Sequence, residues 1–569
     1  MNRRGKQTIE VLTGRFYVLL GLLGLALVAL LARAIDLQIL RQDFYQHQGD
    51  VRHVRQVEIA ASRGMIVDRN GEPLAISTPV QSVWSKPRDL LDHPGGVGRL
   101  ARVLNLDADE LTRRLSQRSE KSFVYVRRRI APALAEAVTE LKLPGVHLER
   151  EYQRFYPAGE VAAHVLGFTD VDDQGQEGLE LSFDDWLRGT PGAKRVIRDR
   201  LGQTIENVEQ VRAAVPGRDL ITTLDRRLQY LSYRALKAAV MEFGARSGSA
   251  VVLEVGSGEV LAMVNQPSYN PNARSGRYEH MRNRAITDVF EPGSVIKPFA
   301  IAAALESGQY DPQSPVETAP GYHNLGAYTI RDAVNYGMLD LTGIITKSSN
   351  VGVSRLALTL DARHLWEVYN RFGFGEITGS GFPGESPGIL TEHNRWREVE
   401  KAAVSYGYGL STTPLQLAQA YAAIANGGRI RAPSFIKDSV NPDRAVLDPT
   451  VAAQIQMMME TVTRGGGTGT RAAVPHYRVA GKTGTSRKAS AQGYNNRYVA
   501  TFAGFAPASD PRVVVVVSIN DPSSEEYYGG QIAAPTFRTI LEGALRLMDV
   551  PPDDLLPAPR ELQLAGEAP

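Results

Sequence analysis

Cysteine is absent from all 569 residues of the chain. Its absence excludes disulfides, thiol catalysis and zinc–thiolate sites, and it is compatible with an oxidising compartment. The chain also lacks a strong excess of charge of either sign, because the formal net charge is only +2. Such a balance does not favour a nucleic-acid-binding protein. Internal repeats and long low-complexity segments are missing as well.

What is present is ordinary for a globular protein of several domains. The residues are 43% apolar and 22% charged, both typical of folded soluble domains. A chain of this length usually forms several domains. We therefore expect a multidomain α+β protein and look for its boundaries in the pattern of the chain.

The only long apolar run lies at residues 16–32 and carries no charge before Arg33. It follows a basic segment and is about long enough to cross a bilayer, which predicts a cytoplasmic N-terminus at 1–15 and a transmembrane anchor at 16–38. A cleaved signal peptide is the alternative, since Ala32-Arg33-Ala34 imitates a cleavage site. The run is longer than a usual signal sequence, so the anchor is favoured. Everything after it should then lie outside the cytoplasm.

Residues 39–215 are polar and rich in turns, with short strand-like pieces. Residues 62–75 predict two strands joined by a turn at Asn70-Gly71. His164 stands alone in an apolar run, which favours a packed side chain over a metal ligand. An ion-pair network that keeps this module rigid is expected from Arg63, Asp68, Arg69 and Arg154. The physical interpretation is a pedestal that holds a further domain away from the membrane.

Residues 216–550 alternate between strand and helix patterns. A helix is predicted at 226–243 and another at 532–548, with apolar strands at 249–254, 259–264, 498–505 and 512–519. Strands at both ends of a long helical middle predict one antiparallel sheet flanked by helices, with the middle forming an all-α lobe. The proline-rich segment 551–569 has no periodicity and is predicted to be a disordered tail.

Ser294 and Lys297 mark the start of a strongly apolar segment that reads as a buried helix. Pro298 is tolerated only near a helix start. Ser294 and Lys297 would then share one face of the first turn, which places a hydroxyl nucleophile beside an amine base. Taken alone, S-x-x-K is equally compatible with a helix cap and a surface lysine.

Two further motifs follow in the order expected of one active site. Ser348-Ser349-Asn350 can direct a hydroxyl and an amide toward one cleft, although an ordinary turn has the same composition. Lys482-Thr483-Gly484-Thr485 predicts a strand that can pair with an extended peptide, where Gly484 permits close approach of a backbone. An edge strand with a solvated lysine is the plain alternative.

The ordered set S-x-x-K, S-x-N and K-T-G resembles that of the serine penicillin-recognising acyl transferases. The N-terminal half is similar to class B penicillin-binding proteins in Arg63-Gly64, Asp68-Arg69-Asn70-Gly71 and Arg154-Phe155-Tyr156-Pro157. Phe372-Gly373-Phe374-Gly375 and the single anchor most resemble the division-specific FtsI-type transpeptidases. Val295-Ile296 stands where Thr-Val is common, which leaves both reactive positions intact.

The resemblance implies a nucleophile, Ser294, that attacks the carbonyl between two terminal D-alanines of a peptidoglycan stem peptide. Lys297 would be the base, with its pKa lowered by burial and by the charge of Lys482. The implied roles of the other residues are proton relay by Ser348, amide binding by Asn350, carboxylate binding by Thr483 and Thr485, close approach at Gly484, and an oxyanion hole formed by the backbone N–H groups of Ser294 and Thr485. No metal or other cofactor is implied.

The implied partners are peptidoglycan stem peptides and lipid II-derived glycan strands, β-lactam antibiotics, a membrane glycosyltransferase like FtsW, and other division proteins. The implied location is the bacterial inner membrane, with the catalytic domain in the periplasm. Alternatives with the same motifs are an elongation-type transpeptidase, a D,D-carboxypeptidase, a β-lactamase and a β-lactam sensor. A β-lactamase would need a carboxylate base, for which Glu385 and Glu392 are available.

Overall fold

The computed structural model describes residues 13–41, 54–198, 204–274, 278–439, 441–490 and 493–555. The chain divides into two compact units. Unit 1 comprises Met1–Ala61, Val80–Glu151 and Gly189–Pro216, and unit 2 comprises Ser62–Pro79, Tyr152–Arg188 and Gly217–Pro569. Two segments of the predicted pedestal therefore group with the C-terminal part of the chain.

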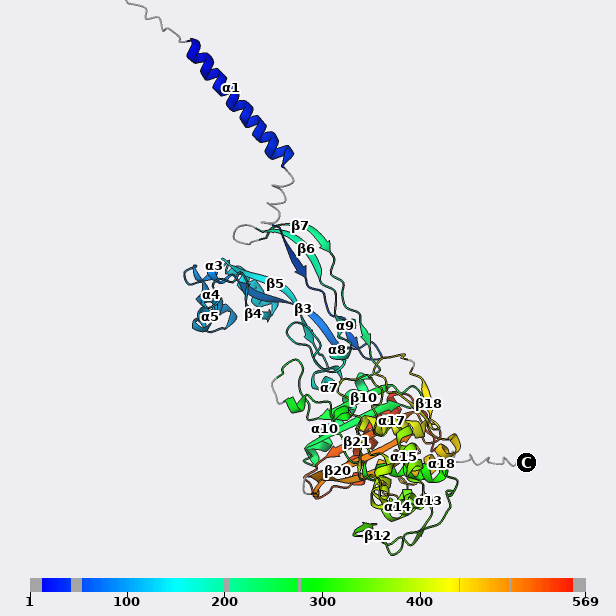
Figure 1. Cartoon of the computed structure of the whole chain (residues 1–569). Coiled ribbons are helices and arrows are strands. Elements are labelled where there is room, and N and C mark those ends of the chain that lie inside the picture. The colour runs from blue at the N-terminus through cyan, green and yellow to red at the C-terminus, as the bar shows by residue number, and fades with distance from the viewer. Residues whose placement is uncertain are drawn as a thin grey trace, which may run out of the picture. The chain divides into compact units, whose positions relative to one another are not determined.

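The predicted apolar helix is present as α1 (Thr13–Ile35; Figure 1), and a short π-helix, η1 (Asp36–Leu40), continues it. Its apolar side chains are exposed, from Phe16 to Leu31. By length and composition this helix can cross a membrane. Residues 1–12 of the expected cytoplasmic segment lie outside the described residues.

Unit 1 contains an antiparallel sheet in the order β1-β6-β7 and a small helical layer. The second half of β3 pairs with β4, as at Trp84↔Tyr125. Leucines of α4 and α5 form the core of this layer together with Val83. The elements are β1 (Val54–Ile59), β3 (Pro73–Ser85), α3 (Pro87–Leu91), α4 (Gly96–Leu104), α5 (Ala108–Ser116), β4 (Val124–Ile130), α6 (Pro132–Glu140), β5 (Val146–Phe155), β6 (Gly192–Arg198) and β7 (Thr204–Arg212).

The predicted Asn-Gly hairpin is confirmed at the start of unit 2. Strand β2 (Ile66–Val67) pairs antiparallel with β3, and Gly71 adopts φ +88° in the turn between them. Parallel to β2 runs β8 (Leu220–Ile221). Four short helices lie between β5 and β6 in the sequence: η2 (Gly159–Val161), α7 (Ala163–Leu166), α8 (Gly178–Ser182) and α9 (Asp184–Leu187). His164 is buried on α7 as expected, and its Nε2 lies 2.8 Å from the carbonyl oxygen of His280.

The ion-pair network of this region exists, but its acids differ from the one expected. Glu180 joins two arginines, with 2.7 Å from Arg63 Nε to Oε2 and 2.6 Å from Arg154 Nε to Oε1. Arg63 also lies 2.6 Å from Asp184. Asp68 instead accepts backbone hydrogen bonds in the hairpin turn. The expected role for Asp68 was wrong because the true partners are more than a hundred residues away from Arg63 in the sequence.

Replacing Glu180 with glutamine is expected to destabilise unit 2 strongly. The side chains of Glu180, Arg63 and Arg154 are at most 1% exposed. The change therefore leaves the buried guanidinium of Arg154 without its acid, while Arg63 retains only Asp184. The expected loss is about 3–5 kcal/mol of unfolding free energy, measured by denaturant titration. As a control, Glu367→Gln breaks the exposed pair with Arg363 and should cost at most about 1 kcal/mol. Equal losses for the two variants would contradict this prediction.

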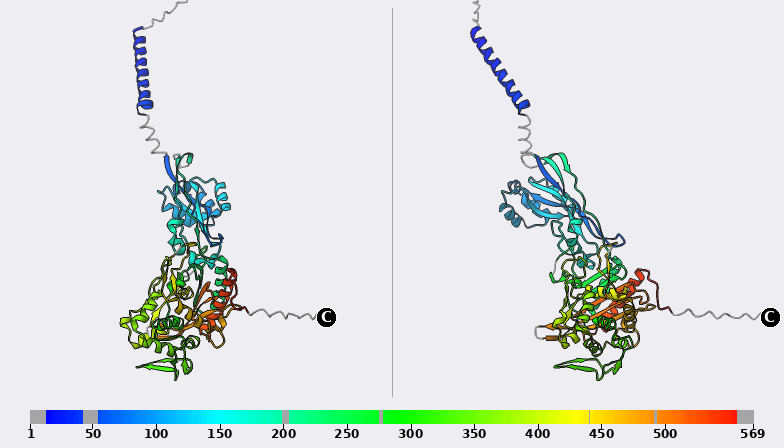
Figure 2. Two further views of the ribbon diagram at one scale, coloured as in Figure 1. Left: turned by 90° about the vertical axis from the view of Figure 1, so that its right-hand side faces the viewer. Right: turned by 45° about the vertical axis from the view of Figure 1, so that its right-hand side comes forward.

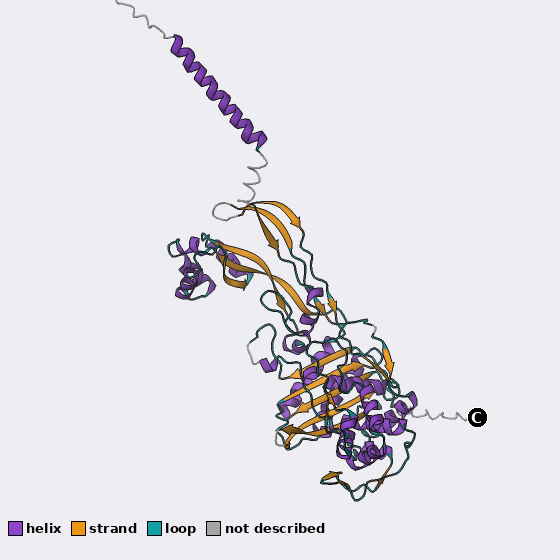
Figure 3. Ribbon diagram, viewed as in Figure 1, coloured by secondary structure: helices purple, strands orange, loops and turns teal. Residues whose placement is uncertain are grey.

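The core of unit 2 is a five-stranded antiparallel sheet in the order β10-β9-β21-β20-β19 (orange strands in Figure 3). Helices α10 and α19 pack on one face, and α11 and α17 on the other. In Figure 2, α19 is the red helix beside the orange strands. The strands are β9 (Ser247–Glu254), β10 (Val260–Gln266), β19 (Ala480–Ser490), β20 (Gly493–Ala506) and β21 (Val513–Asn520), and the helices are α10 (Arg226–Glu242), α11 (Arg284–Thr287), α17 (Pro414–Ala425) and α19 (Gly529–Leu547).

Successive side chains along these strands point to opposite faces of the sheet, so each strand contributes to the cores on both sides. Val514 and Val516 belong to the core under α17, whereas Val513, Val515 and Val517 belong to the core under α10 and α19. A run of valines therefore predicts a strand that is buried on both sides. The expected antiparallel sheet with flanking helices is confirmed.

The expected helical lobe lies between β10 and β19 in the sequence. Its helices are η3 (Tyr278–His280), η4 (Gly293–Ile296), α12 (Lys297–Glu306), α13 (Leu341–Lys347), α14 (Asn350–Thr359), α15 (Ala362–Arg371), η5 (His393–Arg395), α16 (Glu398–Ser405), α18 (Pro449–Glu460) and η6 (Thr470–Ala472). The same part of the chain also contains short two-stranded sheets: β11 (Val316–Glu317) with β14 (Met338–Leu339), β12 (Tyr322–Leu325) with β13 (Tyr328–Arg331), β15 (Ile389–Leu390) with β16 (Leu410–Ser411), and β17 (Arg429–Arg431) with β18 (Asp443–Ala445).

The predicted tail begins within the described residues. Asp553 accepts a hydrogen bond of 2.7 Å from the backbone N–H of Arg478. Residues 556–569 lie outside the described part of the chain.

Candidate active site

Ser294 lies in the single 3₁₀ turn η4, which leads directly into α12. Gly293 begins this turn with φ +57°, and its N–H donates to the carbonyl of Gly407 at 3.0 Å. The helix after it is buried from Lys297 to Leu305, as the apolar pattern predicted. Ser294 itself is half-buried, so its hydroxyl is held on a rigid element at the edge of the core.

The three motifs meet around the hydroxyl of Ser348. Lys297 Nζ lies 3.2 Å from Ser348 Oγ and 2.7 Å from Asn350 Oδ1. Lys482 Nζ lies 2.8 Å from the same Ser348 Oγ. One hydroxyl is therefore bonded to two amines that come from segments 185 residues apart in the numbering. The alternative interpretations as a surface lysine and a solvated edge lysine are wrong, because both lysines are 0% exposed.

Burial controls the protonation of the two lysines. It lowers the pKa of Lys297 well below its usual value, and the charge of Lys482 lowers that pKa further. Burial also lowers the pKa of Lys482 to about 7. The expected causes of the shift at Lys297 are confirmed, and a neutral amine that can accept a proton is available near neutral pH.

Strand β19 brings the K-T-G motif against the Ser294 turn. It is the edge strand of the sheet and pairs only with β20 in this part of the chain. A Cβ at Gly484 would lie 2.9 Å from the carbonyl oxygen of Pro292. The sequence predicted that Gly484 makes room for a substrate backbone. In the structure it also makes room for the protein's own backbone at Pro292, directly before the Ser294 turn.

The hydroxyls of the two motif threonines are held by residues that the motifs do not include. Thr483 Oγ1 lies 2.8 Å from Thr468 Oγ1. Thr485 Oγ1 accepts a hydrogen bond of 2.9 Å from the N–H of Gly529, the first residue of α19. These partners orient the side chains and have no signature in the sequence around the motif.

Asp332 is a functional residue that the sequence analysis missed. Its carboxylate accepts hydrogen bonds of 2.5 Å from Ser349 Oγ and from the N–H of Asn350, and one of 3.0 Å from the N–H of Val351. These bonds hold the S-x-N turn, in which Ser348 has φ +61°. The charge of Asp332 also raises the pKa of Lys297, opposing the larger effects of burial and Lys482.

Replacing Asp332 with asparagine is expected to slow acylation by penicillin about 10-fold or more, because hydrogen bonds to a charged group are lost. The loss of the anion should also lower the pKa of Lys297 further. The family resemblance implies that the neutral amine of Lys297 is the base, so the rising limb of the pH–rate profile should move to lower pH. Asp361→Asn, which removes a negative charge at the N-cap of α15 and keeps a side-chain oxygen that can cap the helix, should leave the midpoint in place. A midpoint for Asp332→Asn that stays or rises would contradict this account.

Comparison with known proteins agrees with this geometry. Residues 58–222 match the penicillin-binding protein dimerisation domain, and residues 248–542 match the penicillin-binding protein transpeptidase domain. The chain is 45% identical over 561 residues to the peptidoglycan D,D-transpeptidase FtsI of Escherichia coli strain K12, covering 97% of this chain and 95% of that protein.

Two further relatives point the same way. The probable peptidoglycan D,D-transpeptidase PbpC of Pseudomonas aeruginosa is 43% identical over 548 residues, covering 96% of this chain and 97% of that protein. The crystal structure of penicillin-binding protein 3 from Mycobacterium tuberculosis is similar with a TM-score of 0.67 at 29% identity, over 87% of this chain and 98% of that one. The chain therefore belongs to the class B penicillin-binding proteins of the FtsI type, with a dimerisation domain and a transpeptidase domain.

Proposed function

We propose that this protein cross-links peptidoglycan stem peptides through an acyl-enzyme formed on Ser294. The observation that carries the proposal is the hydroxyl of Ser348 bonded to both Lys297 and Lys482. This arrangement gathers two amines of lowered pKa around one hydroxyl, and Lys297 begins the helix that directly follows the Ser294 turn.

In the first half-reaction, neutral Lys297 accepts the proton of Ser294 Oγ as that oxygen attacks the carbonyl between the two terminal D-alanines. The backbone N–H groups of Ser294 and Thr485 stabilise the resulting oxyanion, each worth about 3–4 kcal/mol in related sites. Collapse of the intermediate breaks the peptide bond. Ser348 passes the proton to the leaving amine, and D-alanine departs.

In the second half-reaction, the amine of a neighbouring stem peptide attacks the ester carbonyl. Its proton returns through the same groups to Ser294 Oγ, and the cross-link forms as the acyl bond to the enzyme breaks. Asn350 holds a substrate amide, while Thr483 and Thr485 bind the terminal carboxylate. Gly484 keeps β19 close enough to the Ser294 turn for both motifs to contact one substrate.

We place the reaction on the periplasmic side of the bacterial inner membrane. The basic residues before α1 favour a cytoplasmic N-terminus, with the anchor at 16–38, a pedestal at 39–215 and the catalytic domain at 216–550. Proposed partners are glycan strands made from lipid II, a membrane glycosyltransferase like FtsW and other division proteins. β-Lactams would act as inhibitors by acylating Ser294.

The test is product analysis with the full-length protein, lipid II and a membrane glycosyltransferase. Cross-linked muropeptides that disappear on addition of penicillin support the proposal. Stem peptides shortened by one D-alanine without cross-links would instead indicate a D,D-carboxypeptidase. Filaments on depletion support a role in division, whereas rounded cells would indicate an elongation enzyme.

Glu385 does not fit the β-lactamase alternative. Its carboxylate accepts a hydrogen bond of 2.7 Å from the N–H of Thr378, and further bonds from the hydroxyls of Thr378 and Ser380. These hydrogen bonds stabilise the loop that carries Glu385, so its carboxylate is already engaged there and does not serve as a base for deacylation. Rapid turnover of nitrocefin would nevertheless restore the β-lactamase assignment.

A further inference from the structure

A pocket of about 540 Å³ lies in unit 2 beyond the Ser294 turn, at the end of the sheet face that α17 covers. Glu291, three residues before the nucleophile, lines it, and so do Ser486, Arg487, Lys488 and Ala489 of β19. The pocket therefore adjoins the motif strand immediately after Thr485. None of the three catalytic motifs contributes a residue to it.

The floor of this pocket is polar where the rest of the same sheet face is apolar. Along β21 the inward residues change from Val514 and Val516 to Ser518 and Asn520. The paired positions of strand β9 are also polar: Ser249 pairs with Ser518, and Ser247 pairs with Asn520. Polar side chains thus replace apolar ones at paired positions of two neighbouring strands. They form a hydrophilic surface, whereas a sheet face that only packs against a helix is normally apolar.

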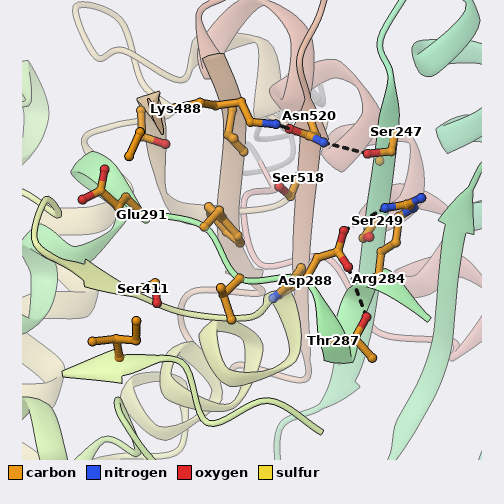
Figure 4. A pocket seen from close by; sticks show the side chains of 18 of the residues that line it. Ser247, Ser249, Arg284, Thr287, Asp288, Glu291, Ser411, Lys488, Ser518 and Asn520 are labelled. Carbon is orange, nitrogen blue, oxygen red and sulfur yellow. Dashed lines mark hydrogen bonds and ion pairs between the residues drawn. The ribbon is translucent and has the colours of Figure 1, made fainter. Parts of the chain in front are cut away.

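Lys488 is the main cation directed at this floor. Its Nζ donates a hydrogen bond of 2.8 Å to Asn520 Oδ1, and Asn520 in turn donates to Ser247 Oγ at 2.8 Å (Figure 4). Lys488 is half-buried and forms no salt bridge with the described residues. Burial lowers the pKa of Lys488. The charges of Asp521 and Asp288 act on it from a longer distance and raise its pKa, while those of Arg497 and Arg246 lower it. A bound anion would compensate this partly desolvated charge.

The remaining walls also carry more positive than negative charge. Arg282 and Arg284 share one acid, Asp288, at 2.7 and 2.8 Å. Arg487 adds a further exposed cation at the mouth. Burial raises the pKa of the opposing acid, Glu291, which favours its neutral form. The lining therefore matches a ligand with a carboxylate rather than a cation.

A peptide bound at Ser294 can extend in only one direction along β19. The strand is buried from Ala480 to Gly484, whereas Arg487 and Ala489 are exposed. An extended chain that pairs with the edge of β19 and places its C-terminal carboxylate near Thr485 must leave past Arg487. Three strand residues span roughly 10 Å, so one or two peptide residues before the D-alanine pair reach the pocket.

We propose that this pocket is a specificity subsite that binds a side-chain carboxylate of the peptide substrate, carried within the two residues that precede the D-alanine pair. Lys488 is the receptor for that carboxylate, with Ser518 and Asn520 as hydrogen-bonding partners. This inference rests on the proposed acyl transfer at Ser294 and deepens it, because it assigns the residues that select the donor peptide.

The test is competition with fluorescent penicillin for Ser294 of the full-length protein. Two synthetic peptides are compared, both ending in D-Ala-D-Ala, one preceded by two glutamates and the other by two glutamines. We expect the glutamate peptide to slow penicillin labelling at about 10- to 100-fold lower concentration, the effect of one charge-assisted hydrogen bond. Lys488→Gln should remove this preference and leave penicillin labelling without competitor unchanged.

The matched control is Lys237→Gln, a lysine on the surface of α10 that is 43% exposed, which should retain the preference. The proposal is overturned if the wild type treats both peptides alike, if neither peptide competes, or if Lys488→Gln weakens both equally. A failure of penicillin itself to label Ser294 would overturn the proposed function instead. The two failures are therefore distinguishable.

Discussion

Replacing Ser294 with alanine is expected to abolish covalent attachment of penicillin and all cross-linking activity. In the proposed mechanism the hydroxyl oxygen of Ser294 forms the acyl bond, and no other group of the described site is assigned that role. Loss of the nucleophile in a serine enzyme typically costs roughly 10⁴-fold or more in rate. Intact-mass spectrometry after exposure to benzylpenicillin measures the result directly, as one added acyl group on the wild type and none on the variant.

The substitution should leave the fold intact. Ser294 is half-buried, and its Oγ makes no hydrogen bond to another of the residues that the structure describes. Alanine also suits the helical turn. A thermal unfolding midpoint close to that of the wild type is the control. A well-folded Ser294→Ala protein that still acquires the label would refute the assignment of the nucleophile.

Replacing Lys297 with methionine is expected to slow acylation about 10²- to 10⁴-fold, the usual contribution of a general base. Methionine fills a similar volume and removes a buried amine, so we expect no loss of stability from an uncompensated charge. Lys297→Arg is the informative partner variant. It places a permanent cation near Ser348, because a guanidinium does not give up its proton in this pH range. This variant has no neutral base and should also be slow.

The same assignment predicts the sign of the pH dependence. Burial and Lys482 hold the pKa of Lys297 well below its ordinary value. Only the neutral amine accepts the proton of Ser294, so the acylation rate of the wild type should rise as pH increases through that pKa and then level off. Stopped-flow labelling across pH should show this limb in the wild type and lose it in Lys297→Met. A wild-type rate that falls over this range would exclude Lys297 as the base.

Local patterns predicted the elements of the fold well. The apolar run is α1, the Asn-Gly turn joins β2 and β3, and the valine run is β21. The periodicity of side chains is a property of neighbouring residues, so it can be recognised without knowledge of distant contacts. The predicted ends of the elements differed from the observed ends by a few residues. The last helix, for example, was predicted at 532–548 and is observed at Gly529–Leu547, because capping and packing against other elements decide where a helix begins.

The partners of buried charges could not be predicted in this way. Arg63 was assigned to a network, but Glu180 on α8 supplies its main acid. Asp332 follows β13 with no motif around it, yet it holds the S-x-N turn and opposes the pKa shift of Lys297. Both carboxylates lie far in sequence from the groups they contact. Their roles depend on the packing of whole elements.

The sequence by itself determined which reactive groups this protein carries, because the order and spacing of Ser294, Lys297, Ser348, Asn350 and Lys482 match one family of acyl transferases. It also determined the apolar helix and the sheet that presents the last motif. Only the tertiary structure decided that Ser348 lies between two buried amines, and that polar residues of β9 and β21 meet in register beneath Lys488. The reason is physical: the pKa of a lysine and the ligand of a pocket depend on burial and on distances between remote segments, and local sequence does not specify these quantities.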